Sequence, residues 1–226
     1  MELELGEINN DLVREFEKLE PTGCENPMPT FQTRITNTKT QVLTNHPRHI
    51  RVSVPVQPLS FMYFDGAPNA ELLQSDIPKD VIFEFQKMDE SQIQVKAMLK
   101  DLKPQLGCER SLVLALYGNL MGTLSGEDEK ITDLVKKLRV DRETFVEYYK
   151  LLRGAKGKRA IGVYDLYEKL QKSEITVDPY QLAFVAAVLC ELGILRFAGT
   201  VQINEGIKTE LDASNVYKKI TNKKEK

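Results

Sequence analysis

The stretch "RHIRVSVPV", residues 48–56, carries the clearest structural signal in the chain, because apolar and polar side chains alternate along it. This period of two is typical of a β-strand that buries one face. The polar face carries Arg51 and Ser53. The apolar face carries Ile50, Val52, Val54 and Val56. The sequence therefore predicts a strand here that packs one side against a core.

Segments of similar β character lie on both sides of this strand, at residues 30–44, 59–66, 80–88 and 91–104. In the fourth strand Val81, Phe83 and Phe85 share a face. In the last strand Ile93, Val95, Ala97 and Leu99 lie opposite Gln94, Lys96 and Lys100. Residues 67–80 are long enough for one short helix. Five strands with a helix after the third favour a small OB-type Greek-key β-barrel over a β-sandwich, which usually has about seven strands.

The segment before the strands reads as a helix followed by a stiff junction. Asn10 is expected to cap a helix over residues 11–20, with Leu12, Phe16 and Leu19 on one face. Pro21 ends it, because proline cannot continue the helical hydrogen bonds. The stretch "EPTGCENPMPTF", residues 20–31, holds three prolines and one glycine, which mark turns.

The C-terminal part shows the hydrophobic periodicity of helices. Residues 105–125 favour a helix over a buried strand, and Ser125 is expected to cap the next helix. Further helices are capped by Asp141 and by Asp178, and the last of these is apolar nearly all round, as in a central buried helix. A hairpin turn at residues 198–199 follows. Three helices and a β-hairpin follow the plan of a winged helix.

The sequence thus predicts an α+β chain, a five-stranded OB-type barrel followed by a mainly helical, winged-helix-like domain. The predicted segments are a helix and proline-rich junction at 1–29, an OB domain at 30–104, connecting helices at 105–138, a winged-helix-like domain at 139–220 and a basic tail at 221–226.

Composition and motifs argue against an enzyme. The three cysteines lie far apart without a CxxC pair, which fits a reducing cytoplasm, and no apolar run approaches the ~18 residues of a membrane span. HExxH, GxSxG and P-loop motifs are absent. The two histidines, His46 and His49, have no Asp or Glu near them in the sequence, so neither a metal site nor a catalytic residue is predicted.

Charge is distributed unevenly along the chain. Residues 26–64 contain no Asp or Glu but four Lys or Arg side chains, although the whole chain has a net charge of −2. Cations and aromatic rings are what OB barrels use to hold single-stranded nucleic acid, and Phe61 and Tyr63 are the predicted stacking platform. Two alternatives stay open: the basic residues form a solvated face without a ligand, or the apolar run at residues 61–64 belongs to the core. The candidate binding residues are Arg34, Lys39, Arg48, His49, Arg51, Phe61, Tyr63 and Lys96.

A second basic cluster lies between two helices of the C-terminal part, where it either contacts a nucleic-acid backbone or forms a flexible solvated loop. It consists of Arg153, Lys156, Lys158 and Arg159.

The order of these pieces resembles bacterial RecJ, a family of 5′-to-3′ exonucleases specific for single-stranded DNA. Residues 19–31 resemble the junction L-x-P-F-G-x-x-N-P-x-P-x-F that leads into the RecJ OB domain, with Thr22 in place of the usual phenylalanine. The segments "HIRVSV", "FMYFDG" and "VKAMLKDLKP" resemble that domain, and "DRETFVEYYKLLR" and "VLCELGILRF" resemble the C-terminal domain of RecJ from Gram-positive bacteria. The matching junction residues are Leu19, Pro21, Gly23, Asn26, Pro27, Pro29 and Phe31.

The resemblance implies a non-catalytic portion of such an exonuclease. The family's DHH and DHHA1 nuclease motifs are absent, so Mn or Mg is expected only in that missing core, and residues 1–29 would be the end of a DHHA1-like region. The implied partners are single-stranded DNA, single-strand-binding protein and a DHH nuclease core, in DNA repair and recombination, and the junction would set the angle between core and barrel. The alternatives are a scaffold module without DNA affinity and, less favoured, a winged-helix regulator that reads duplex DNA.

Overall fold

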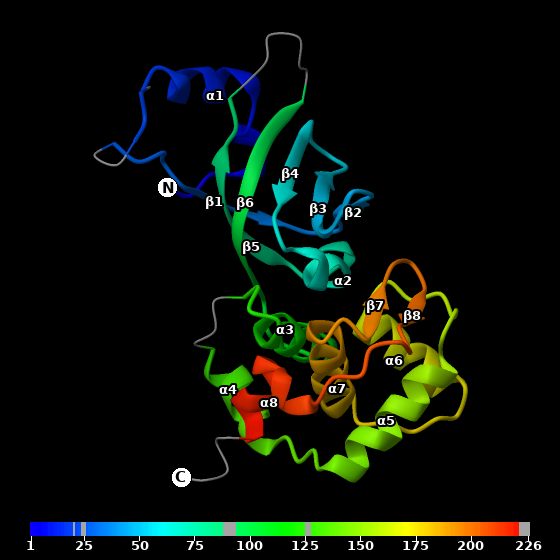
Figure 1. The fold of residues 1–226 in the computed structure, drawn as a ribbon. Helices are drawn as coiled ribbons and strands as arrows, with labels where there is room; N and C mark the ends of the chain where they lie inside the picture. The colour runs from blue at the N-terminus through cyan, green and yellow to red at the C-terminus, as the bar shows by residue number, and fades with distance from the viewer. Residues whose placement is uncertain (20, 24–25, 88–93, 125–127, 222–226) are drawn as a thin grey trace. The chain divides into compact units, whose positions relative to one another are not determined.

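The computed structural model describes residues 1–19, 21–23, 26–87, 94–124 and 128–221 (Figure 1). The chain divides into two compact units, residues 1–105 and residues 106–226. The first combines a sheet with short helices and the second is mainly helical, so the protein is α+β. The finer five-segment division stays a prediction.

The first unit contains one mixed six-stranded sheet. Its strands are β1 (Phe31–Ile35), β2 (Lys39–Leu43), β3 (His46–Val54), β4 (Leu59–Tyr63), β5 (Lys79–Phe85) and β6 (Val95–Pro104). Their spatial order is β1-β5-β6-β4-β3-β2, and every neighbouring pair is antiparallel except β4 and β6, which are parallel.

The prediction of a single strand over residues 30–44 was wrong, because this segment forms both β1 and β2. Asn37 between them has a φ of 48°, a left-handed conformation that asparagine tolerates better than most residues. The backbone N–H groups of Asn37 and Thr38 donate to the carbonyls of Ser75 and Leu73 at 3.2 and 3.3 Å. The two outermost strands of the sheet order are thus joined by only three residues.

The predicted alternation in β3 is confirmed over most of its length. Ile50, Val52 and Val54 are buried, and Arg51 is exposed. Val56 does not follow them and is 79% exposed. β3 ends at Val54 because Pro55 lacks the N–H needed to continue strand pairing, and the chain turns there.

The helix predicted after residues 59–66, the third predicted strand, is confirmed. It follows β4 and consists of a 3₁₀ turn, η2 (Ala67–Asn69), and α2 (Ala70–Gln74). The buried ammonium group of Lys79 donates to the carbonyls of Leu72, Leu73 and Ser75 at 2.7, 3.0 and 2.8 Å. Lys79 is the first residue of β5, so these hydrogen bonds connect that strand to the end of α2. In Figure 1 α2 lies at one end of the sheet and α1 at the other.

The N-terminal segment forms η1 (Leu5–Glu7) and α1 (Asn10–Glu17). The cap is Asn9, one residue before the predicted Asn10, and its side chain accepts the Leu12 N–H at 2.9 Å. Phe16 packs edge-on against Phe31 with ring centroids 4.6 Å apart. Leu19 is exposed and lies beyond the helix, so the prediction that it shares the packed face was wrong.

A short turn follows α1 at the proline-rich junction. The side-chain amide of Asn26 donates to the carbonyls of Leu19 and Pro21, both at 3.1 Å, and the Gly23 N–H donates to the Asn26 carbonyl at 2.8 Å. Asn26 thus fixes the path of the chain from helix to sheet. Part of the predicted junction, residues 20, 24 and 25, lies outside the described residues.

The second unit is built around a buried helix, as predicted. Its elements are α3 (Glu109–Leu120), α4 (Glu129–Lys137), α5 (Arg142–Gly154), α6 (Val163–Lys172), α7 (Pro179–Glu191), β7 (Leu195–Phe197), β8 (Val201–Ile203), η3 (Leu211–Ala213) and α8 (Asn215–Thr221). All residues from Leu182 to Leu189 of α7 are buried, and α7 contacts α3, α5, α6 and α8 (Figure 1). The hairpin β7–β8 follows the three helices α5, α6 and α7.

The helix caps of this unit match the sequence in part. Asp141 accepts the Thr144 N–H at 2.7 Å, and Asp178 accepts the Gln181 N–H at 2.8 Å, as predicted. Ser125 lies outside the described residues, and the cap of α4 is Asp128. Thr221, the first residue of the predicted basic tail, is the last residue of α8, and the rest of that tail lies outside the described residues.

Candidate nucleic-acid interface

Strand register brings outward-facing side chains of four adjacent strands into two rows. Successive residues of a strand point to opposite faces, so the positions that alternate with Ile50 and Val52 in β3 and with Phe61 in β4 lie on the other face, where Ser60 is nevertheless buried. One row runs through Lys39, Ser53, Ser60 and Lys96, and the next runs through Gln41, Arg51, Met62 and Met98. These rows cross β2, β3, β4 and β6.

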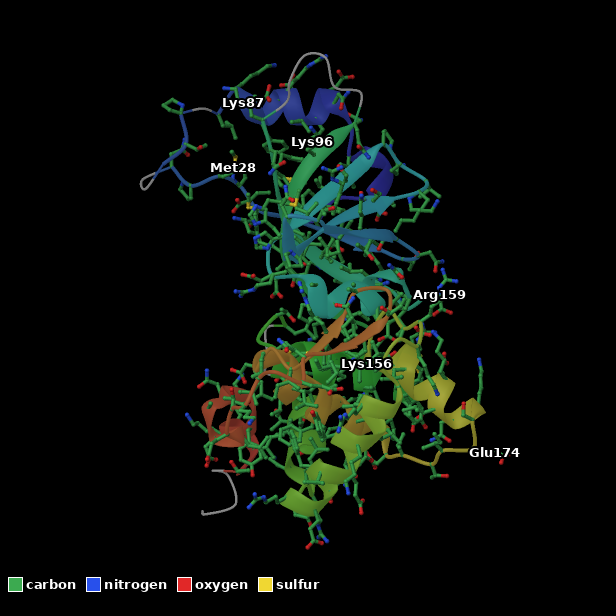
Figure 2. All side chains as sticks on the ribbon, turned by 45° about the vertical axis from the view of Figure 1, so that its right-hand side comes forward. Met28, Lys87, Lys96, Lys156, Arg159 and Glu174 are labelled. Atoms are coloured by element: carbon green, nitrogen blue, oxygen red, sulfur yellow. The ribbon has the colours of Figure 1, made fainter. Side chains whose placement is uncertain are left out.

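Lys39, Arg51 and Lys96 are the cations of these two rows, and all three are exposed (Figure 2 labels Lys96). Lys100, on the same face of β6, is paired with Glu84 at 2.8 Å. Among the described residues, none of the three has a carboxylate within ion-pair distance. Three strand spacings separate β2 from β6, about 14 Å along the sheet. The structure therefore brings together three predicted binding residues whose charges are available to a polyanion.

Arg34 lies elsewhere and is engaged. It belongs to β1, at the other end of the strand order, and its guanidinium donates to both carboxylate oxygens of Asp80 at 2.7 and 3.2 Å. This hydrogen bond and the charge of Asp80 raise the pKa of Arg34 above its ordinary value. The structure does not bring Arg34 together with Arg51.

Arg48, His49 and His46 lie at the end of the β2–β3 hairpin, beside a carboxylate that comes later in the chain. Arg48 Nε lies 2.9 Å from Asp65 Oδ1, and the Asp65 N–H donates to His49 Nδ1 at 3.0 Å. The histidines have no acid near them in the sequence, but the fold brings Asp65 close to both Arg48 and His49. The β3–β4 hairpin brings Asp65 back beside β3, a contact that sequence proximity does not reveal.

The predicted stacking platform was also wrong. Phe61 is fully buried and Tyr63 is only 4% exposed, so neither ring is open to a nucleobase. Burial raises the pKa of Tyr63 to about 12, against a smaller opposing effect of the Asn69 hydrogen bond to its hydroxyl. The side chains on the other side are Met62 in β4 and Phe64 in the turn that follows it.

Phe64 is the aromatic side chain that sequence reasoning missed. It is 49% exposed, and its ring meets that of His49 edge-on with centroids 5.0 Å apart. The sequence holds no clear signal for it, because Phe64 directly follows the largely apolar segment of β4, whose alternation does not show which rings face outward.

Residues 1–101 match the family model described as the RecJ OB domain. This part of the chain is a RecJ-like OB region. It contains α1, the junction and most of the sheet, including both rows of outward-facing residues. No curated protein matches the chain.

The second predicted basic cluster lies outside the RecJ-like OB region, with Arg153 in the last turn of α5 and the other three residues in the loop after it (Figure 2 labels Lys156 and Arg159). Glu205 accepts from Arg153 at 3.2 and 3.3 Å and lies 3.5 Å from Lys156 Nζ. The hydrogen bond and charge of Arg153, and then the charge of Lys156, lower the pKa of Glu205. Within the described ranges, Lys158 and Arg159 have no ion-pair partner. Two of the four cations thus share one carboxylate, which offsets one of the four positive charges.

The described residues contain no group of three or more His, Cys, Asp or Glu side chains that could hold a metal ion. None of their helices is long and apolar enough to cross a membrane.

Proposed function

We propose that the RecJ-like OB region binds single-stranded DNA across the outward face of β2, β3, β4 and β6. The observation that carries this proposal is the set Lys39, Arg51 and Lys96, three exposed cations without a carboxylate partner among the described residues, on one face of a RecJ OB domain. Positive charge along a groove or sheet face holds the phosphates of single strands in OB folds.

The same proposal includes closure of the sheet into a barrel. β1 and β2 are the outermost strands of the order β1-β5-β6-β4-β3-β2, and they are joined by three residues whose backbone is held by the segment after α2. Closure between them would leave no free edge. The order of α5, α6, α7 and the hairpin supports a winged-helix-like arrangement in the second unit.

We further propose that the chain has no nuclease activity of its own and serves a RecJ-like exonuclease in DNA repair and recombination. Phosphodiester hydrolysis by this class needs carboxylates and histidines gathered around metal ions. The partial neutralisation of the cluster near Glu205 supports protein contacts, such as with single-strand-binding protein, for the second unit.

The decisive experiment is fluorescence anisotropy of a labelled oligothymidine titrated with the full chain at several salt concentrations. Three phosphate contacts predict a slope of log affinity against log salt of about −2. A duplex of the same length is the control and is expected to bind more weakly. If no salt-dependent binding occurs even at low salt, the proposal fails and a scaffold module without DNA affinity is the better account.

A further inference from the structure

Three rings, two of them exposed and that of His49 partly buried, form a continuous ladder at one end of the outward face of the RecJ-like OB region. The His46 and His49 rings are stacked, with centroids 5.7 Å apart and an interplanar angle of 26°. The next ring is Phe64, edge-on to His49 at 5.0 Å. We propose that Phe64, His49 and His46 form the site on which bases of the bound single strand stack, an inference that rests on the proposed DNA binding.

The ladder is held in place before any ligand binds. His49 lies in β3, and Phe64 is the first residue after β4, just beyond the register pair Ile50 and Tyr63. The Asp65 N–H donates to His49 Nδ1 and fixes the plane of that ring. Asp65 itself adopts a left-handed φ of 54°, and its carboxylate is held by Arg48. Such preorganisation lowers the entropic cost of binding.

The hydrogen bond to Asp65 also sets the chemistry of His49. An imidazole whose Nδ1 accepts a hydrogen bond carries its proton on Nε2 when it is neutral. Nε2–H is then a donor at the other side of the ring. The His49 side chain is 25% exposed, so it offers ring surface and a donor at the same place.

Charge around the ladder suits a polyanion better than a protein segment. Arg51 follows His49 on the same face of β3, two residues along the strand. The carboxylate of Asp65 is paired with Arg48 at 2.9 Å, so its repulsion of a phosphate is reduced. Aromatic rings beside cations match the bases and phosphates of a single strand, respectively.

The chain contains no tryptophan, so a single fluorophore can be placed in the ladder. In the variant Phe64→Trp, stacking of a base is expected to quench the indole fluorescence as oligothymidine is added. The matched control is Val56→Trp, because Val56 is 79% exposed on the turn between β3 and β4, away from the ladder. This control is expected to show little quenching at the same degree of binding.

An abasic oligonucleotide of the same length separates stacking from phosphate binding. It is expected to bind Phe64→Trp with a similar salt slope, but without quenching. If oligothymidine binds with the expected slope and the indole signal does not change, the stacking site is wrong while the proposed function stands. If oligothymidine does not bind to the wild-type chain at all, both fail.

Conservative variants give a second readout that a merely structural role would not produce. Phe64→Leu is expected to weaken binding of oligothymidine by roughly five- to a hundredfold, the range measured for loss of one stacked base, and to leave the salt slope unchanged. Phe64→Tyr keeps the ring and is expected to bind like wild type. Equal affinities for Phe64→Leu and wild type would overturn the inference.

Discussion

Residues 34–51 of the RecJ-like OB region and residues 153–159 of the helical unit each contain four Lys or Arg side chains and no carboxylate. In both stretches the fold pairs two of the four cations with acids from elsewhere in the chain: Asp80 and Asp65 in the first, Glu205 in the second. The two stretches differ in what surrounds the remaining cations.

In the OB region, strand register places Lys39 and Arg51 on one outward face together with Lys96, and the exposed ring of Phe64 directly follows β4. In the helical unit, Lys158 and Arg159 are consecutive residues of a loop, with no such alignment. Equal local charge therefore does not mean equal capacity to bind DNA, because a strand of DNA needs cations in a row and rings to stack on.

The largest expected effect tests which face of β4 is buried. Phe61→Ala should destabilise the OB region by about 3–5 kcal/mol, because a fully buried ring is lost from the core. Phe64→Ala should change stability by no more than about 0.5 kcal/mol, since half of that side chain is exposed. Urea denaturation followed by far-UV circular dichroism measures both. Similar losses for the two variants would mean that the two faces are assigned wrongly.

The next effect separates free from paired cations within the basic stretch of the OB region. Arg51→Ala should weaken oligothymidine binding by about 0.5–1.5 kcal/mol and flatten the salt slope by about 0.7, the value of one phosphate contact. Arg34→Ala should leave the slope unchanged, because its guanidinium is held by Asp80. Anisotropy titrations of both variants check this, and a flatter slope for Arg34→Ala would contradict it.

A smaller effect concerns acid stability of the helical unit. Burial raises the pKa of Glu191, but hydrogen bonds from the Ser214 hydroxyl at 2.6 Å and the Val216 N–H at 2.9 Å outweigh it, and the pKa lies below its ordinary value. Glu191 therefore stabilises the unit above the ordinary glutamate pKa of about 4.3, and this stabilisation is lost as pH falls through the lower folded value.

Glu191→Gln should lower the stability of this unit at neutral pH by about 0.5–1 kcal/mol, allowing for solvent screening of an exposed carboxylate. The difference from wild type should disappear at a pH below the folded pKa of Glu191. Thermal melts across a pH series measure it, and a difference that persists in strong acid would show that the charge is not responsible.

The smallest expected effect tests whether Glu205 prevents the second basic cluster from binding DNA. Glu205→Gln should release Arg153 and Lys156 and make the salt slope of DNA binding steeper by about 0.7, one added contact. The same oligothymidine titration measures it. If the slope does not change, something other than this carboxylate keeps the loop from binding.

The parts of the fold that were predictable are those governed by local rules. Period-two alternation located the strands that carry Ile50, Phe83 and Ala97 on the core side, and aspartate caps located α5 and α7. These signals depend on neighbouring residues only, so the sequence displays them directly.

The parts that were missed depend on residues distant in the sequence. The break at Asn37 depends on backbone acceptors near Ser75, and the pairing of Arg153 depends on Glu205. The error at Phe61 has another cause. The β4 segment is largely apolar, so no alternation of polar and apolar residues shows which of its faces is buried. The position of an ion-pair partner across the sheet, as for Arg34 and Asp80, follows from register, which a single sequence does not fix.

One measurement tests the central claim most directly: the salt dependence of oligothymidine binding for two matched triple variants. One replaces Lys39, Arg51 and Lys96 with alanine, and the other replaces Lys156, Lys158 and Arg159. Each removes three positive charges from the chain. The account predicts that the first loses nearly all of a slope of about −2, while the second keeps the wild-type slope. Equal flattening in the two variants, or loss of slope in the second alone, would contradict it.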